Sequence, residues 1–218
     1  MPRAALFDMD RTLLAKETAS LYVRYQRRIG EASARDLVRT LGWVAQYTLG
    51  VLDHVAIAEK ALRSLEGMHE NVMAGRCDDW FRRDVERFIT DGGRQAVARH
   101  RAAGDTCAIV TGASLYASRP LARRLAIPHV VASVFEVDPA SGRFTGRAEH
   151  PICVGPGKVE RAAAFLAAQG LPVEEAIFYT DSITDLPLLE RVAEPVVVNP
   201  DPRLARVARQ RGWRVERW

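Results

Sequence analysis

The chain is predicted to fold as an α/β protein with one parallel sheet, helices on both faces of that sheet and an inserted all-helical segment. Two features of the sequence give this prediction. Short apolar runs alternate with segments whose apolar residues recur at helical spacing, which is typical of parallel strands joined by helical crossovers. A long stretch after the first run contains helical spacing only, which indicates the insert. The expected sheet is therefore Rossmann-like.

Individual elements follow from the same patterns. Strands are expected at residues 3–8, 106–110, 129–133, 176–180 and 195–198. Helices are expected at residues 92–103, 114–125, 158–169, 186–192 and 202–210. Residues 135–146 alternate around the turn sequence Asp-Pro-Ala-Ser-Gly, which predicts a hairpin.

Between the first strand and residue 90 no comparable strand pattern occurs. Apolar residues recur there at helical spacing, at Leu37, Leu41, Val44, Ala45, Thr48 and Leu49. We therefore expect residues 16–90 to form a helical insert, and residues 1–15 together with 91–218 to form the main α/β unit.

Composition narrows the class of protein. The 218 residues are 48% hydrophobic and 27% charged, which is ordinary for a globular chain with one large domain, or one domain plus an insert. The net charge of +4 comes from arginines that are spread among acidic residues, so no nucleic-acid surface is expected. Three cysteines without C-x-x-C spacing predict neither a disulfide framework nor a zinc site.

The amino terminus runs directly into a core strand, so no signal peptide is expected. No stretch of about 18 uncharged apolar residues is present, so stable membrane insertion is not expected. We predict a cytoplasmic protein.

The most informative motif is a pair of aspartates, Asp8 and Asp10, at the end of the first strand. Because side chains alternate faces along a strand, residues two apart point the same way. Two such carboxylates repel each other unless a cation neutralises them or one stays protonated, which favours a hard metal ion or acid/base chemistry. The alternative is a turn in which the aspartates and Thr12 cap a following helix.

Further chemical groups are expected at the same edge of the sheet, because ligands of parallel sheets bind beyond the carboxyl ends of the strands. Thr111 and Gly112 follow the second major strand, where a hydroxyl and free backbone amides suit a phosphate. Asp181 follows a later strand, with Asp185 four residues on, and Lys158 supplies a cation at a helix start. Alternatively, Thr111 and the two aspartates are helix caps and Lys158 is a surface lysine.

Four ordered motifs resemble those of the haloacid dehalogenase superfamily of phosphohydrolases. They are Asp-x-Asp-x-Thr at 8–12, Ile-Val-Thr-Gly at 109–112, Lys158, and Asp-Ser-x-x-Asp at 181–185. The resemblance covers essentially the whole chain. The helical insert is similar to the subfamily I cap, and the carboxyl-terminal motifs resemble subfamily IB, the phosphoserine-phosphatase-like branch.

This resemblance implies a Mg²⁺-dependent phosphatase that acts through an aspartyl phosphate. It makes Asp8 the nucleophile and Asp10 the general acid and base. It implies that the metal is held by the carboxylates of Asp8 and Asp181 and by the backbone carbonyl of Asp10, while Asp185 orients the metal's waters or Lys158.

The resemblance also implies that Thr111, Gly112 and Lys158 bind the phosphate and that Thr12 and Ser182 support the site. The chemistry agrees, because a carboxylate that attacks a phosphate dianion needs positive charge beside both. Asp10 must also protonate a leaving alkoxide, so its pKa must lie above the usual value of about 3.9.

For the substrate, the resemblance places Glu17 where a phosphoserine phosphatase recognises an amino group; alternatively, Glu17 is a first-turn glutamate favoured by the helix dipole. Lys60 and Arg63 do not match the family's arginine for the serine carboxylate. Small partners such as phosphoserine-like metabolites or histidinol phosphate are candidates. The resemblance to subfamily IB also implies a phosphatidylglycerophosphate-type lipid as the alternative. Residues 41–52 are apolar and include Trp43 and Tyr47; we expect them to pack between helices of the insert, and the alternative is that they shape an apolar substrate pocket or contact lipid.

Two other activities share an acidic pair. A two-component receiver would be a non-enzymatic phospho-acceptor switch, but its phosphorylated aspartate follows an internal strand in a chain of about 120 residues. A phosphotransferase would return the phosphoryl group to a second hydroxyl. A dinucleotide-binding protein is not indicated, because no G-x-G-x-x-G follows the first strand.

Overall fold

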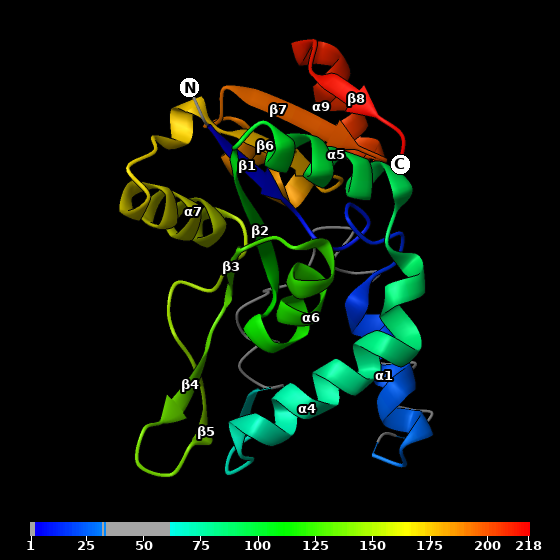
Figure 1. The fold of residues 1–218 in the computed structure, drawn as a ribbon, viewed down its shortest axis with the longest axis vertical. Coiled ribbons are helices and arrows are strands. Elements are labelled where there is room, and N and C mark those ends of the chain that lie inside the picture. Colours follow the sequence, from blue (N-terminus) through cyan, green and yellow to red (C-terminus); the bar gives the residue numbers. More distant parts are fainter. Residues whose placement is uncertain (1–2, 32, 34–61) are drawn as a thin grey trace.

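The computed structural model of the chain describes residues 3–31, 33 and 62–218. A parallel sheet with strand order β3-β2-β1-β6-β7-β8 forms its centre (Figure 1). The strands are β1 (Ala4–Phe7), β2 (Thr106–Ser114), β3 (His129–Ser133), β6 (Ile177–Thr180), β7 (Glu194–Val198) and β8 (Arg214–Glu216). The predicted α/β class with a parallel sheet is confirmed.

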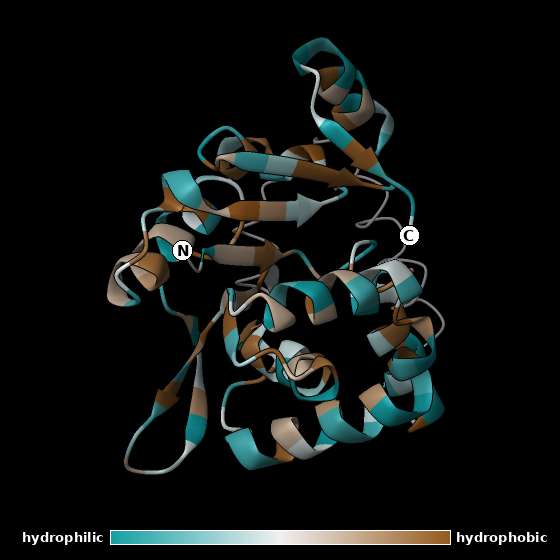
Figure 2. Ribbon diagram, turned by 45° about the horizontal axis from the view of Figure 1, so that its top comes forward, coloured by the Kyte–Doolittle hydropathy of each residue, from teal (hydrophilic) through white to brown (hydrophobic). Residues whose placement is uncertain are grey.

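Helices cover both faces of the sheet, because the side chains of β1 alternate between two apolar cores. Ala5 and Phe7 belong to one core and Ala4 and Leu6 to the other. The first core includes residues of α5 (Asp91–Ala102) and α6 (Leu115–Leu125). The second includes residues of α7 (Pro156–Ala168), α8 (Leu186–Leu189) and α9 (Pro202–Arg211). Apolar strands lie between helices of mixed hydropathy in Figure 2.

Two boundaries differ from the sequence prediction by more than two residues, and one strand was missed. Strand β2 continues to Ser114 instead of ending at residue 110, and its pairing with β3 shifts register between Val110 and Ser114. Helix α8 ends at Leu189, and a short 3-10 turn, η4 (Ile183–Asp185), precedes it. Strand β8 was not predicted, because three residues of sequence Arg-Val-Glu at a sheet edge carry no recognisable strand pattern.

The described part of the insert is helical. It contains α1 (Thr18–Arg28), α4 (Glu70–Trp80), the π-helical turn η1 (Phe81–Val85) and the 3-10 turn η2 (Glu86–Phe88). Leu21, Tyr25, Trp80 and Val85 from these elements join the first core, so apolar packing continues from the sheet into the insert. The predicted helical stretch at residues 37–49, with Trp43 and Tyr47, lies outside the described residues.

The predicted hairpin forms from β4 (Phe135–Asp138) and β5 (Arg143–Ala148). Phe144 packs with Met73 and Cys77 of α4 and Tyr116 of α6, so the hairpin connects the insert to the α/β unit. A 3-10 turn, η3 (Val173–Glu175), precedes β6. Within residues 3–31 and 62–218, every helix is too short or too polar to cross a lipid bilayer.

Candidate active site

Three neighbouring strands, β2, β1 and β6, bring the sequence motifs to one edge of the sheet. Phe7 of β1 pairs with Ile109 of β2 and with Tyr179 of β6. Asp8 is the next residue after β1, and its backbone N–H donates to the carbonyl of Tyr179 at 2.8 Å. Thr111 and Asp181 lie two residues beyond these pairs, so this register places the groups side by side at the carboxyl ends.

Lys158 lies between two carboxylates. Its ammonium donates to Asp8 Oδ1 at 2.9 Å and to Asp185 Oδ2 at 2.8 Å, and all three residues are buried. The hydroxyl of Thr180 also donates to Asp185 Oδ2, at 2.6 Å. Burial opposes the charge of Lys158, but the carboxylates of Asp185 and Asp8 raise its pKa well above the usual value. Lys158 is therefore a fixed cation, and Asp185 holds it in place.

A glycine positions this lysine. A Cβ on Gly157 would lie 2.1 Å from the backbone carbonyl oxygen of Ile152, a distance that no side chain tolerates. The same loop reaches β2, where a Cβ on Gly112 would lie 3.0 Å from Val154 Cγ2. Absence of a side chain at both positions therefore brings the start of α7 close to β2.

Asp10 is held by the first turn of α1. The backbone N–H of Thr18 donates to Asp10 Oδ1 at 3.1 Å, and the Thr18 hydroxyl donates to Oδ2 at 2.9 Å. Burial and the charge of Asp8 raise the pKa of Asp10 to about 7. Asp10 can therefore carry a proton near neutral pH, which the sequence argument required of a general acid.

Carboxylates outnumber cations at this edge. Burial, opposed by Lys158, raises the pKa of Asp8 to about 6. Burial and repulsion from Asp8 and Asp185 raise the pKa of Asp181 to about 9. Four acidic side chains, those of Asp8, Asp10, Asp181 and Asp185, thus share this edge with the ammonium of Lys158. So many buried carboxylates are unfavourable unless some of them take up protons or a further cation enters.

The donor set fits Mg²⁺. The candidate ligands are two carboxylates, Asp8 and Asp181, and the backbone carbonyl of Asp10, all hard oxygen donors. Mg²⁺ is commonly held by one or two carboxylates, with water and substrate oxygens completing its shell. The part of the chain that the structure describes contains no cage of three or more His, Cys, Asp or Glu side chains. A site with only two side-chain ligands is consistent with that finding.

The surroundings of Thr111 differ from the sequence prediction. We expected Thr111, Gly112 and Ala113 to lead from the strand into the helix predicted at residues 114–125, but they lie in β2, and α6 begins at Leu115 with Ser114 as its cap. The Thr111 hydroxyl accepts from the Ala113 N–H at 3.2 Å, within the stretch where pairing with β3 is interrupted. The irregular strand, rather than a helix start, therefore presents this threonine.

Ser133 was missed by the sequence analysis. Its hydroxyl donates to the carbonyl of Gly112 at 3.1 Å and accepts from the N–H of Cys153 at 3.2 Å. The contact ties β2 to the loop before Lys158. Nothing near Ser133 in the sequence signals it, because both partners are about 20 residues away in the chain.

Thr12 and Ser182 support the backbone. The Thr12 carbonyl accepts from the hydroxyl of Thr90, the cap of α5, at 3.1 Å. The Thr12 hydroxyl is buried without a hydrogen-bond partner among the described residues. Ser182 caps η4, where its hydroxyl accepts from the N–H of Thr184 at 3.3 Å. Both residues therefore stabilise turns that carry the acidic groups.

Asp201 is another residue that the sequence analysis did not single out as part of the site. Its carboxylate accepts from the N–H of Ile183 at 2.7 Å, and its own N–H donates to the carbonyl of Asp181 at 2.9 Å. It also caps α9 through the N–H groups of Arg203 and Leu204. The Asp-Pro sequence that begins α9 predicts the cap, but the contact with the Asp181 turn depends on the fold.

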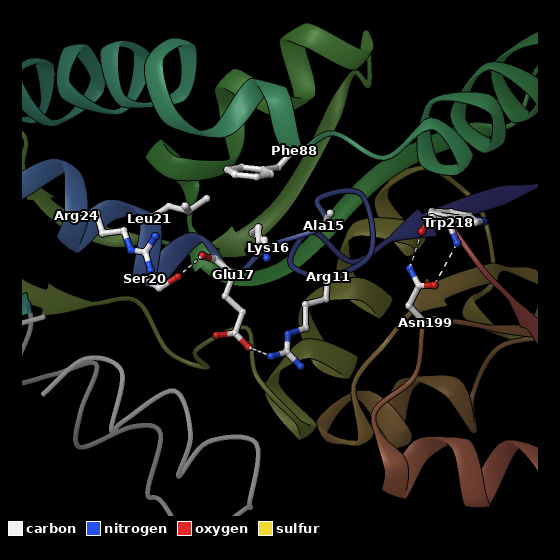
Figure 3. Close-up of a pocket in the computed structure, with 10 residues that line it drawn as sticks. All are labelled: Arg11, Ala15, Lys16, Glu17, Ser20, Leu21, Arg24, Phe88, Asn199 and Trp218. Atoms are coloured by element: carbon white, nitrogen blue, oxygen red, sulfur yellow. Dashed lines mark hydrogen bonds and ion pairs between the residues drawn. The ribbon is translucent and has the colours of Figure 1, made fainter. Parts of the chain in front are cut away.

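A pocket of about 590 Å³ lies at the start of α1 (Figure 3). Its described lining includes Arg11 and Glu17, the chain neighbours of Asp10 and Thr18, but not Asp8, Asp10, Lys158 or Asp181. Glu17 lines it from the cap position of α1, where its side chain makes no capping bond. Its carboxylate instead pairs with Arg11 at 2.9 Å. Arg63 does not line this cavity and is exposed, and Lys60 lies outside the described residues.

Comparison with known proteins identifies the family of the chain. Residues 5–190 match the family model of the haloacid dehalogenase-like hydrolases. The chain belongs to this family. The predicted resemblance is therefore confirmed, and the chain is a hydrolase by family.

Named relatives cover nearly the whole chain. Phosphoserine phosphatase SerB1 of Mycobacterium tuberculosis is 30% identical over 97% of this chain and 70% of its own length. Histidinol-phosphatase of Neisseria meningitidis is 27% identical over 99% of this chain and 98% of its own length. The crystal structure of a Bordetella pertussis protein of unknown function superposes with a TM-score of 0.88 at 34% identity, covering 99% and 98% of the two chains.

Proposed function

We propose that this protein is a Mg²⁺-dependent phosphatase that hydrolyses a small phosphate monoester through an aspartyl phosphate on Asp8. The observation that carries the proposal is the buried contact of Lys158 with Asp8 and Asp185, beside the further carboxylates of Asp10 and Asp181. Family membership and the phosphatase names of the relatives support it.

Asp8 is the proposed nucleophile. Its carboxylate is fixed by the ammonium of Lys158, so it loses little conformational freedom when a phosphate approaches. Attack on phosphorus splits one slow displacement into two steps, formation and hydrolysis of the aspartyl phosphate. In the first step the ester oxygen leaves, and in the second a water displaces Asp8 and inorganic phosphate departs.

Asp10 is the proposed general acid and base. With a pKa of about 7 it is partly protonated near neutral pH, so it can donate a proton to the leaving ester oxygen. The resulting carboxylate can then take a proton from the attacking water. The two hydrogen bonds from Thr18 keep the carboxylate in one orientation through both steps.

Positive charge and hydrogen-bond donors for the phosphate would come from Lys158, from the hydroxyl of Thr111 and from backbone near Gly112. Mg²⁺, held by Asp8, Asp181 and the carbonyl of Asp10, would neutralise negative charge between the phosphate and the attacking carboxylate. Asp185 positions Lys158 in this scheme, and Thr12 and Ser182 stabilise the loops.

Residues 1–15 and 91–218 are the proposed catalytic core, and residues 16–90 are the proposed cap. Glu17, from the first part of that cap, lines a pocket together with Arg11, the residue that follows Asp10, which supports a contact between the cap and the leaving group. A volume of about 590 Å³ suits a metabolite-sized leaving group. Phosphoserine-like esters and histidinol phosphate are the candidates that the named relatives suggest, and a cytoplasmic location stays a prediction.

A phosphate-release screen tests the proposal. Purified protein would be given p-nitrophenyl phosphate, phosphoserine and histidinol phosphate, with Mg²⁺ and again after chelation. We expect release that requires Mg²⁺ and is abolished by Asp8→Asn. Wild-type rates in the Asp8→Asn variant would refute the nucleophile assignment. Transfer of phosphate to added alcohols without free phosphate would instead identify a phosphotransferase.

A further inference from the structure

We propose that Arg11 determines substrate specificity, because its pairing with Glu17 leaves the cavity at the start of α1 with excess positive charge. Leaving groups that carry a second anionic group are then bound in preference to those that carry an ammonium group. The inference rests on the proposed phosphatase function, and it differs from what the family resemblance implies for Glu17.

The contacts of Glu17 are the first step. A free carboxylate at this position would attract an ammonium group, but Arg11 occupies it at 2.9 Å. The side chain of Glu17 is 18% exposed and that of Arg11 is 46% exposed, so the guanidinium is the more accessible partner. A ligand entering the cavity therefore meets Arg11 more readily than the glutamate.

The other charged side chains that line the cavity also favour an anionic ligand. Among the residues that the structure describes, Lys16 and Arg24 also line it, which gives three cationic side chains against the one carboxylate of Glu17. Glu17 and Arg24 are seven residues apart on α1, two turns along the same face. Within residues 3–31 and 62–218, no ion pair engages Lys16 or Arg24. Breaking the Arg11–Glu17 pair would not reverse the balance, because Arg11 would stay in the cavity.

The pair is also close to the reacting groups. Arg11 directly follows Asp10, and Glu17 directly precedes Thr18, which donates both hydrogen bonds to the Asp10 carboxylate. The backbone of Arg11 has φ of 55°, which is uncommon for a residue with a side chain. The chain thus keeps an arginine where glycine or asparagine would be less strained, as expected if the guanidinium is used.

Two isosteric ligands test the inference. Phosphoglycolate and O-phosphoethanolamine are two-carbon phosphate monoesters that end in a carboxylate and an ammonium group. Their affinities would be measured by calorimetry in the Asp8→Asn background with Mg²⁺, and their kcat/KM values in the otherwise unchanged protein. We expect phosphoglycolate to be preferred roughly 10-fold in both measurements, as the Coulomb energy of one or two nearby exposed charges predicts.

Variants assign the preference to residues. Arg11→Asn, chosen because asparagine tolerates positive φ, should bring the two ligands to about equal affinity. Arg24→Gln should narrow the preference by weakening phosphoglycolate binding, and it carries the test if Arg11→Asn does not fold. Arg27→Gln is the matched control, because it removes one exposed cation from the same helix outside the cavity and should keep the preference.

Equal binding of the two ligands, preference for O-phosphoethanolamine, or an unchanged preference in a folded Arg11→Asn variant would overturn the inference. If Arg11→Asn does not fold, an unchanged preference in Arg24→Gln would overturn it. A binding preference for phosphoglycolate without phosphate release from any ester would contradict the proposed function and support the charge assignment of the cavity. The two failures are therefore distinguishable.

Discussion

Two buried carboxylates lie at opposite edges of the sheet. Asp105 precedes the amino-terminal end of β2, and Asp181 follows the carboxyl-terminal end of β6. The Asp105 carboxylate bonds to His100 Nδ1 at 2.6 Å and accepts from the N–H of Arg3 at 3.1 Å. Although burial opposes its charge, these contacts lower its pKa below the usual value. No such partner reaches the Asp181 carboxylate within the described residues, and its pKa is raised to about 9.

The opposite pKa shifts of Asp105 and Asp181 show that burial alone does not determine the pKa of a carboxylate; its hydrogen-bond donors and neighbouring charges also do. At the Asp105 edge each charged oxygen has a donor, so the carboxylate stabilises the fold. At the Asp181 edge, Lys158 contacts Asp8 and Asp185, and no described cation lies within hydrogen-bonding distance of the Asp10 or Asp181 carboxylate, so burial and repulsion raise the pKa values of these two groups. Raised pKa values are typical of functional sites, and we propose that they serve here the binding of a divalent cation and the transfer of a proton.

The largest effect is expected from Lys158→Met. Removing the ammonium leaves Asp8 and Asp185 buried without their cation, which should cost about 3 to 5 kcal/mol of unfolding free energy and abolish turnover. Chemical denaturation and phosphate release measure both. Lys16→Met makes the same chemical change at an exposed position and should alter stability by less than about 0.5 kcal/mol. Similar losses in the two variants would contradict the account.

Asp10→Asn should come next. The amide cannot exchange the proton, so kcat should fall about 10² to 10⁴-fold while the fold is kept. The loss should be greater for an alkyl phosphate than for p-nitrophenyl phosphate in the first step, because nitrophenolate leaves without protonation. Single-turnover measurements on both esters check this. Equal losses in that step would remove Asp10 from the role of general acid.

Gly157→Ala tests the packing around Lys158. Its Cβ would meet the Ile152 carbonyl oxygen at 2.1 Å, so we expect a loss of about 1 to 3 kcal/mol in unfolding free energy and lower activity. Gly75→Ala is the control. Gly75 lies in α4 with no atom within 4 Å of its added Cβ, so alanine should stabilise the protein by up to about 1 kcal/mol. A tolerated Gly157→Ala would show that the loop can move.

The same substitution at the two edges should have opposite signs. Without Mg²⁺ at pH 7, Asp105→Asn should lose about 1 kcal/mol of stability. Asp181→Asn should gain on the order of 1 kcal/mol, because it removes a carboxyl whose pKa of about 9 forces the folded state to take up a proton at pH 7. Mg²⁺ should then raise the melting temperature of the wild type and not that of Asp181→Asn. If Asp181→Asn lowered the unfolding free energy in the presence of chelator, the predicted difference between the two edges would be contradicted.

The sign of the pH effect at Asp105 follows from its lowered pKa. A carboxylate with a depressed folded pKa contributes stability above its unfolded value of about 3.9, and that contribution disappears as pH falls through the folded pKa. The difference between wild type and Asp105→Asn should therefore shrink below about pH 4. Denaturation at pH 7 and at pH 3 measures the difference, and a constant gap would contradict the assigned direction.

The sequence predicted which residues lie at the carboxyl ends of the strands better than it predicted the contacts between side chains there. Asp8, Thr111 and Asp181 were found because each directly follows an apolar run, a local pattern that survives folding. The extension of β2 to Ser114 and the existence of β8 were missed, because strand pairing rather than local composition decides them.

Contacts across the fold were less predictable. Ser133 and Asp201 support the site through partners that lie 20 and 18 residues away in the chain. The Arg11–Glu17 pair lies within a short segment, but it depends on the positive φ of Arg11, which no pattern signals. Local sequence patterns thus predict which residues carry the chemical groups, whereas the tertiary fold determines their partners and their pKa values.

Trapping the covalent intermediate tests the central claim most directly. Wild-type protein mixed with substrate and Mg²⁺ would be quenched in acid, and peptides would be mapped by mass spectrometry. We predict one phosphoryl group, on Asp8, absent after chelation and absent in Asp8→Asn. Steady turnover with a phosphoryl group on another residue, or a phosphorylated peptide that persists in Asp8→Asn, would contradict the account.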